Sequence, residues 1–267
     1  MGTFSSAFED PRFVARIGRL SLASDLLWYA AVAIGVGAAV IAALLYGRED
    51  PASGKFWAYA GLMLRVGLYA WARDGLRGRG GETLWRLLIM GLVAGTFELL
   101  IDWALIHWVH NGKLVYLTGN DVVLLGSPIW MPVAWACVIT DMGYMALRLY
   151  GILQPRLGIT GAAGLSSLVV GISGAVMVGF YEELAFRAYW WEYQKACVMV
   201  TQHCALYVPL GEALMFAAIL PIGVRTLELD EDQPLAGTLL GGACFAVAIA
   251  GGYAVSYFLL EFGRTPS

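Results

Sequence analysis

Several carboxyl side chains of this sequence fall inside long apolar stretches, where an ionised group is costly and is therefore a candidate functional group. Glu98 and Asp102 are four residues apart and would share one face of a helix. Two carboxyls so close in a dry environment cannot both ionise cheaply, so we expect one of them to hold its proton at neutral pH. A protonated carboxyl beside an ionised one is what a general acid requires, and a proton-coupled transporter uses the same arrangement.

Other acidic residues also fall inside predicted membrane spans. The complete set of candidate catalytic residues is Glu98, Asp102, Asp141, Glu182, Glu183 and Glu212. Glu183 and Arg187 are spaced i to i+4, so an ordinary salt bridge explains that pair equally well. No basic residue lies within one turn of Glu98 and Asp102 on their helix, so a salt bridge explains them less well. We expect no resident cofactor or metal, although ligation of Mg²⁺ by these oxygens stays open.

Tryptophan is distributed unevenly along the chain. Seven of the ten tryptophans fall near the predicted outer ends of the apolar stretches, whereas an aromatic belt populates both membrane interfaces. A belt still explains part of them, but the asymmetry favours an aromatic-lined cavity. Aromatic faces attract cations, so carboxyls among aromatics suit a reaction in which an acid protonates an alkene and π faces shelter the carbocation. The candidate substrate-binding residues are Trp103, Tyr116, Trp130, Trp135, Arg187, Trp190 and Tyr193.

Composition shows which elements must position these residues. The 267 residues are 59% hydrophobic and 14% charged, with a mean hydropathy of +0.68, which a soluble domain of this length does not show. A net charge of −3 gives no support for nucleic-acid binding. Apolar runs long enough to span a bilayer occur at 26–46, 56–72, 84–109, 128–150, 162–191, 206–224 and 236–260. The sequence predicts an all-α integral membrane protein, a bundle of about seven transmembrane helices, with residues 26–267 as one domain.

The flanks of the predicted spans indicate an orientation. Ten basic residues lie at one set of span ends and six at the other, which predicts a cytoplasmic N-terminus in a bacterial inner membrane or an equivalent membrane. Residues 1–25 form a basic segment with Arg12, Arg16 and Arg19 at helical spacing. This segment fits an interfacial helix on the lipid surface and a disordered basic lead equally well.

A weak internal repeat relates residues 97–136 to residues 181–214. In each stretch an acidic helix end leads through an aromatic loop to a hydrophobic-Pro-hydrophobic triplet, at Pro132 and at Pro209. Two such helix pairs would form a pseudo-symmetric pocket. The second loop also contains Cys197 and Cys204, which could pair in an oxidising space, although unrelated thiols are the commoner case.

The pattern of Glu98, Tyr116 and the run from Pro128 to Trp135 resembles the membrane carotenoid hydratase family. Size and span number are similar to those of the small transmembrane terpene cyclases, and the ITDMGY stretch around Asp141 is in keeping with them. The resemblance covers residues 95–215 at the level of motifs, and most of the Gly/Tyr-rich loop of the hydratases is absent. It implies a lipophilic isoprenoid substrate, no cofactor, and acid-initiated cyclisation or hydration through a carbocation.

Other functions are weighed against this one. The Glu182-Glu183-x-x-x-Arg187 stretch matches a motif of the intramembrane CAAX-type proteases, but only His203 follows it, in a predicted loop. A retinal protein needs a lysine in the last span, and residues 236–260 contain none. Two alternatives to an isoprenoid-modifying enzyme stay open: a proton- or cation-coupled small-molecule transporter, and an accessory subunit of a membrane complex.

Overall fold

The computed structural model describes residues 20–76, 79–117, 121–232 and 235–264. Helices account for most of them, and the strands are short. In chain order the elements are α3 (Leu22–Ile41), the π-helical turn η1 (Ala42–Tyr46), α4 (Pro51–Gly75), α5 (Arg79–His107), β1 (Lys113–Tyr116), β2 (Val123–Leu124), β3 (Ser127–Pro128), α6 (Met131–Arg187), β4 (Trp191–Gln194), α7 (Tyr207–Ala217), α8 (Ile219–Asp232) and α9 (Ala236–Leu260).

Among the described residues, five helical stretches are long and apolar enough to cross a membrane. They are Leu22–Tyr46, Gly80–His107, Met131–Arg187, Tyr207–Leu227 and Ala236–Leu260. The prediction of an all-α protein with membrane-spanning helices is confirmed, but the count of such helices is five and not seven.

Two features explain the difference in number. The spans expected at 128–150 and 162–191 belong to one 57-residue element, α6, which turns at Gly158 with φ 68° and ψ 179°. Glycine has no Cβ and adopts this backbone conformation without steric cost. The span expected at 56–72 is the middle of α4, a helix whose hydropathy is lowered by charged residues such as Lys55 and Arg65.

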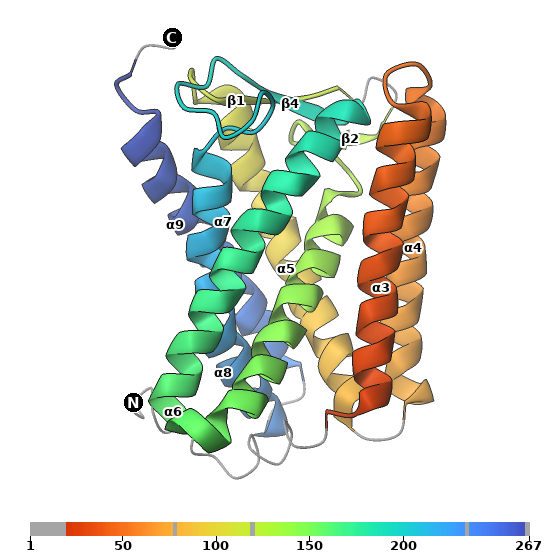
Figure 1. The fold of residues 1–267 in the computed structure, drawn as a ribbon, viewed down its shortest axis with the longest axis vertical. Helices are drawn as coiled ribbons and strands as arrows, with labels where there is room; N and C mark the ends of the chain where they lie inside the picture. Colours follow the sequence, from red (N-terminus) through yellow and green to blue (C-terminus); the bar gives the residue numbers. More distant parts are fainter. Residues whose placement is uncertain (1–19, 77–78, 118–120, 233–234, 265–267) are drawn as a thin grey trace.

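The helices run roughly parallel to one long axis, and α6 forms two arms that meet at one end of the bundle (Figure 1). The strands lie at the other end, which we call the strand end. There β1 and β4 pair antiparallel with Leu114 opposite Tyr193, and β2 pairs with β3. Figure 1 shows α3 and α4 side by side at one edge of the bundle, with α7 and α9 toward the other edge.

Close packing of α5 against the first arm of α6 forms the centre of the bundle. A Cβ at Gly91 would lie 2.6 Å from the Cα of Ala136, and one at Gly95 would lie 2.7 Å from the Cβ of Trp135. Small residues therefore let these two backbones approach, as is common between helices in lipid. The approach fixes the face of α5 that carries Glu98 and Asp102 relative to the start of α6.

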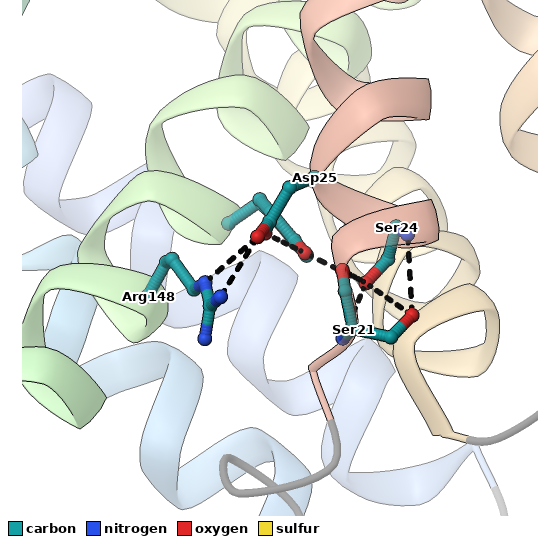
Figure 2. Close-up of polar contacts among 5 residues, drawn as sticks. Ser21, Ser24, Asp25 and Arg148 are labelled. Carbon is teal, nitrogen blue, oxygen red and sulfur yellow. Dashed lines mark hydrogen bonds and ion pairs between the residues drawn. The ribbon is translucent and has the colours of Figure 1, made fainter.

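Polar contacts attach the start of α3 to the first arm of α6 (Figure 2). Ser21 and Ser24 form a capping box that begins the helix. Asp25 accepts hydrogen bonds from Arg148, at 2.8 Å from Nη2, and from the Tyr144 hydroxyl at 2.8 Å. Of the predicted basic segment 1–25, residues 1–19 lie outside the described residues, and α3 begins earlier than the expected first span.

Candidate functional site

A cavity of about 160 Å³ lies among α3, α4, α5, α6, α7, α9 and the strands β1 and β4. Four of the six predicted carboxyl residues line it, and all four are almost fully buried: Glu98 (1% exposed), Asp102 (3%), Glu182 (6%) and Glu212 (2%). The aromatic lining residues are Tyr116, Trp130, Trp135, Tyr181, Trp190, Trp191, Tyr193 and Tyr253. The fold therefore gathers acids from three different helices around one space.

Asp102 lies near the strand end of α5 and receives two hydroxyl donors. The Tyr116 hydroxyl, from β1, and the Ser127 hydroxyl, from β3 at 2.8 Å, both donate to Oδ2 of Asp102. Burial raises the pKa of the Tyr116 phenol well above its ordinary value, so that phenol stays a neutral donor. Two donors on one oxygen favour negative charge on this carboxyl.

Glu98 lies one turn before Asp102 on the same face of α5. Its side chain interacts with that of Asp102 and lies within reach of the Trp135 indole. Its Oε2 atom is buried, and no described residue forms a hydrogen bond with it. Glu98 lines the cavity, so a molecule bound there could supply a partner for that oxygen.

Glu182 occupies the corresponding position near the strand end of α6. The Trp191 indole Nε1 donates to its Oε2 at 2.7 Å, and the Tyr193 hydroxyl donates to its Oε1 at 3.4 Å. Residues two apart on a strand face the same way, which brings both donors from β4 to one carboxyl. The relation of Asp102 to β1 thus resembles that of Glu182 to β4, and the two pairs lie in the two stretches that the weak sequence repeat relates.

Glu212, on α7, is the fourth carboxyl residue that lines the cavity. The Tyr253 hydroxyl of α9 donates to its Oε1 at 2.7 Å, while its buried Oε2 has no hydrogen-bond partner in the described chain. Tyr253 was not among the predicted site residues, because a tyrosine in an apolar span is equally expected in the core. Trp191 and Tyr181 also line the cavity without having been predicted to bind there.

Asp141 is not in the cavity wall. It is ion-paired with Arg65 of α4 and accepts a hydrogen bond from the Tyr69 hydroxyl, while the Trp28 indole donates to its backbone oxygen at 3.2 Å. The first arm of α6 turns this carboxyl toward α4 and away from the other acids. Arg65 itself does line the cavity, a position that the sequence did not predict.

Glu183, Arg187 and Trp103 lie outside the cavity as well. Successive helical residues point about 100° apart, so Glu182 faces inward while Glu183 pairs with Arg187 and with His203, whose Nδ1 is 2.9 Å from Oε2. The salt bridge weighed for Glu183 and Arg187 is therefore present. Trp103 stacks on His107, with ring centroids 5.1 Å apart.

Neither a metal centre nor a disulfide is formed by the residues described. No group of three or more His, Cys, Asp or Glu side chains among them is arranged to hold a metal ion. Cys197 and Cys204 are free thiols. The bridge that pairs Met199 with Ala205 places Cys204 opposite Val200, so Cys197 does not face it. Burial raises the pKa of Cys204 to about 12.

Comparison with known proteins adds a family to this geometry. Residues 99–260 match a family described as a domain of unknown function, DUF6989, and the match covers more than half of the chain. The chain belongs to the DUF6989 family. The DUF6989 segment contains Asp102, Glu182 and Glu212, whereas Glu98 precedes it by one residue and α3 and α4 lie before it. No curated protein and no solved structure matches the chain.

Proposed function

We propose that this DUF6989 protein is a membrane-embedded, cofactor-independent enzyme that protonates an isoprenoid and directs the resulting carbocation to cyclisation or hydration. The observation that carries the proposal is the buried Oε2 of Glu98, which has no described partner and borders a cavity lined by aromatic rings. In this proposal the chain crosses the bilayer seven times. To the five apolar stretches are added a second crossing by α6, which turns back at Gly158, and one by the 25-residue α4, which runs beside α3.

The acid of this reaction is a carboxyl pair that shares one proton. Glu98 and Asp102 are too close, and too deeply buried, for both to carry a charge at low cost. Because Tyr116 and Ser127 both donate to Asp102, the negative charge is favoured there and the proton resides on Glu98. Glu98 can then present its O–H to the cavity.

Protonation consumes that O–H bond. The π electrons of a substrate alkene form a new C–H bond with the Glu98 proton, which leaves a carbocation on the neighbouring carbon and a carboxylate on the enzyme. In cyclisation a second alkene attacks the cation to form a C–C bond, and loss of a proton from an adjacent carbon forms a new double bond. In hydration a water oxygen bonds to the cation, and the proton that it releases returns to a carboxylate.

The aromatic rings supply the surroundings that a carbocation requires. Trp130, Trp190 and Trp191 have ring centroids 6.0 to 6.3 Å apart and form one side of the cavity. Their electron-rich faces stabilise a cation without reacting with it as a carboxylate would. Glu182 accepts hydrogen bonds from Trp191 and Tyr193 and places its carboxyl oxygens on the same side.

Proton acceptance is assigned to Glu212. Its Oε1 accepts a hydrogen bond from the Tyr253 hydroxyl, while Oε2 has no hydrogen-bond partner among the described residues, and Glu212 lines the cavity from α7. A carboxylate oxygen with no donor is the better base of the two, because no hydrogen bond must be broken when it takes a proton. Glu212 therefore accepts the final proton or orients the attacking water.

The test uses the purified protein in lipid nanodiscs, linear isoprenoids with terminal alkenes, and D₂O as solvent. The expected product carries one deuterium on the carbon that is protonated first. Glu98→Gln, which keeps the shape of the side chain, should lower the initial rate by about 10²- to 10⁴-fold, the usual contribution of a general acid. Glu183→Gln is the matched control, because Glu183 lies outside the cavity and pairs with Arg187.

Two results would overturn the proposal. One is the absence of deuterium-labelled product from every isoprenoid tested. The other is an unchanged rate in Glu98→Gln when the same preparation binds substrate. Uptake of an isoprenoid or a small cation into proteoliposomes that depends on a pH gradient, with no chemical change, would instead favour a transporter.

A further inference from the structure

Arg65 has more hydrogen-bond donors than partners. Its side chain is 4% exposed in the middle of α4 and borders the cavity. A guanidinium carries five N–H donors, yet among the described residues its hydrogen bond goes from Nη2 to Asp141, and the buried Nε has no partner. A buried donor without an acceptor is costly, so a guanidinium left in this state beside a cavity points to a ligand that supplies the acceptor.

The backbone of α3 makes room for this guanidinium. A Cβ at Gly35 would lie 2.7 Å from Nη1 and 3.1 Å from Cζ of Arg65, so any larger residue would push the group away from its place. Gly37, two residues further along the same helix, has nothing within 4 Å of such a Cβ. The glycine at position 35 is thus required by the position of Arg65 and not by the packing of α3 in general.

Arg65 and the acid pair lie at different depths in the cavity. Arg65 is 14 residues, or about 21 Å of helix rise, from the strand-end start of α4 at Pro51. Glu98 and Asp102 lie nine and five residues before the strand-end terminus of α5, about 13 and 8 Å by the same rise. The wall on the α3 and α4 side is small and apolar, with Ala38, Ala58 and Gly61.

The charges around Arg65 select the kind of acceptor. Asp141 neutralises the guanidinium, and Tyr69, Tyr181 and Cys137 are the other titratable groups near it. Asp102, whose negative charge is favoured by two hydroxyl donors, lines the same cavity, so a phosphate or carboxylate group would meet repulsion there. A neutral oxygen, such as that of an alcohol, ketone or ether, can accept from Arg65 without this cost.

We infer that Arg65 is a positioning residue that donates a hydrogen bond to an uncharged oxygen of the substrate, and that the substrate is an oxygenated isoprenoid and not a plain hydrocarbon. This inference rests on the proposed function, because it concerns the same cavity. It gives the substrate a direction: the oxygen lies deep, beside α3 and α4, and the hydrocarbon chain extends along the apolar wall toward Glu98 and Asp102.

The test measures binding and needs no turnover. Several tryptophans line the cavity, so quenching of their fluorescence reports occupancy. The ligands are geranylgeraniol and the hydrocarbon that lacks only its hydroxyl. The wild-type protein should bind the alcohol about tenfold more tightly or better, the usual effect of one hydrogen bond to a charged group. Any water held by Arg65 in the free protein would be displaced by the alcohol in this comparison.

Three variants locate the effect. The double variant Arg65→Gln/Asp141→Asn removes both charges together, so neither charge is left buried and unpaired. This variant should bind the alcohol and the hydrocarbon with about equal affinity. Gly35→Ala should reduce the preference by displacing the guanidinium, while Gly37→Ala should leave it unchanged. The Gly35→Ala result keeps the inference testable if the double variant does not fold.

Specific outcomes would overturn the inference. They are equal affinity for the two ligands in the wild type, no binding of either, or a preference that survives both Gly35→Ala and the double variant. These outcomes are separable from failure of the proposed reaction. Equal affinities together with deuterium incorporation that needs Glu98 would refute only the role of Arg65. A preference that depends on Arg65 without any deuterium incorporation would refute only the reaction.

Discussion

The two hydroxyl donors on Asp102 allow the sharing of the proton to be tested directly. Tyr116→Phe and Ser127→Ala each remove one donor and leave the carboxyl in place. The charge on Asp102 is then less favoured, so the shared proton moves from Glu98 toward Asp102 and away from the cavity. A hydrogen bond to a charged group contributes about 1.5 to 3 kcal/mol, which corresponds to a fall in rate of about 10- to 150-fold for each variant.

The double variant adds a second quantity. Both donors act on the same oxygen, so their effects are coupled, and Tyr116→Phe/Ser127→Ala should lose less than the product of the two single losses. The assay is the initial rate of deuterium incorporation at saturating substrate, with thermal unfolding of each variant as the measure of folding. Tyr193→Phe is a comparison variant, because its hydroxyl makes a longer contact, 3.4 Å, with Glu182 and should cost less.

One pattern would refute this reasoning. If Tyr116→Phe and Ser127→Ala fold normally and keep the wild-type rate, the hydroxyls do not decide where the proton resides. A fully multiplicative double variant would show that the two donors act independently and not through one shared oxygen.

Other variants test the carboxyl beside the tryptophans, the helix packing and the orientation. Glu182→Gln should lower turnover about tenfold, since the amide nitrogen cannot accept the hydrogen bond that one carboxyl oxygen receives from Trp191 or Tyr193, while the neighbouring Glu183→Gln should leave turnover unchanged. Gly95→Leu should lower the unfolding free energy by about 1 to 3 kcal/mol or prevent folding, because its side chain would enter the backbone of α6, and thermal unfolding in nanodiscs measures this loss. If the N-terminus is cytoplasmic, a membrane-impermeant maleimide should label Gln202→Cys at the strand end in intact cells and should label Asp74→Cys only after the membrane is opened.

Composition and local pattern were sufficient for the class of the protein and for the four acids that line the cavity. Apolar runs must be helical in lipid, because backbone N–H and C=O groups have no other partners there. A carboxyl within such a run must face protein rather than lipid, which is why the residue pattern predicts six candidate acids. Four of them, Glu98, Asp102, Glu182 and Glu212, line the cavity, whereas Asp141 and Glu183 do not. The spacing of Glu98 and Asp102 on one helix also placed them together correctly.

Hydropathy alone did not give the number of spanning helices, because it does not report two features of this fold, the turn within α6 and the burial of the charged Arg65 in α4. One glycine, Gly158, decides whether α6 is one long helix or two arms, and a run of apolar residues does not report that turn. The charged residues of α4 lower its hydropathy although it packs beside α3. A helix that buries its charged residues against other helices is stabilised by those neighbouring helices. The hydropathy of the helix itself therefore does not report its stability in the bundle.

The direction of each acid was likewise decided by tertiary structure alone. Glu182 and Glu183 are adjacent and chemically identical, yet one faces the cavity and the other an arginine and a histidine at the surface. Asp141 forms an ion pair with Arg65, a residue 76 positions away in the chain. Sequence determined that carboxyls would be buried in a helical membrane bundle. Which of them meet one another was settled only by the rotation of each helix about its axis, and that rotation depends on packing against partners distant in sequence.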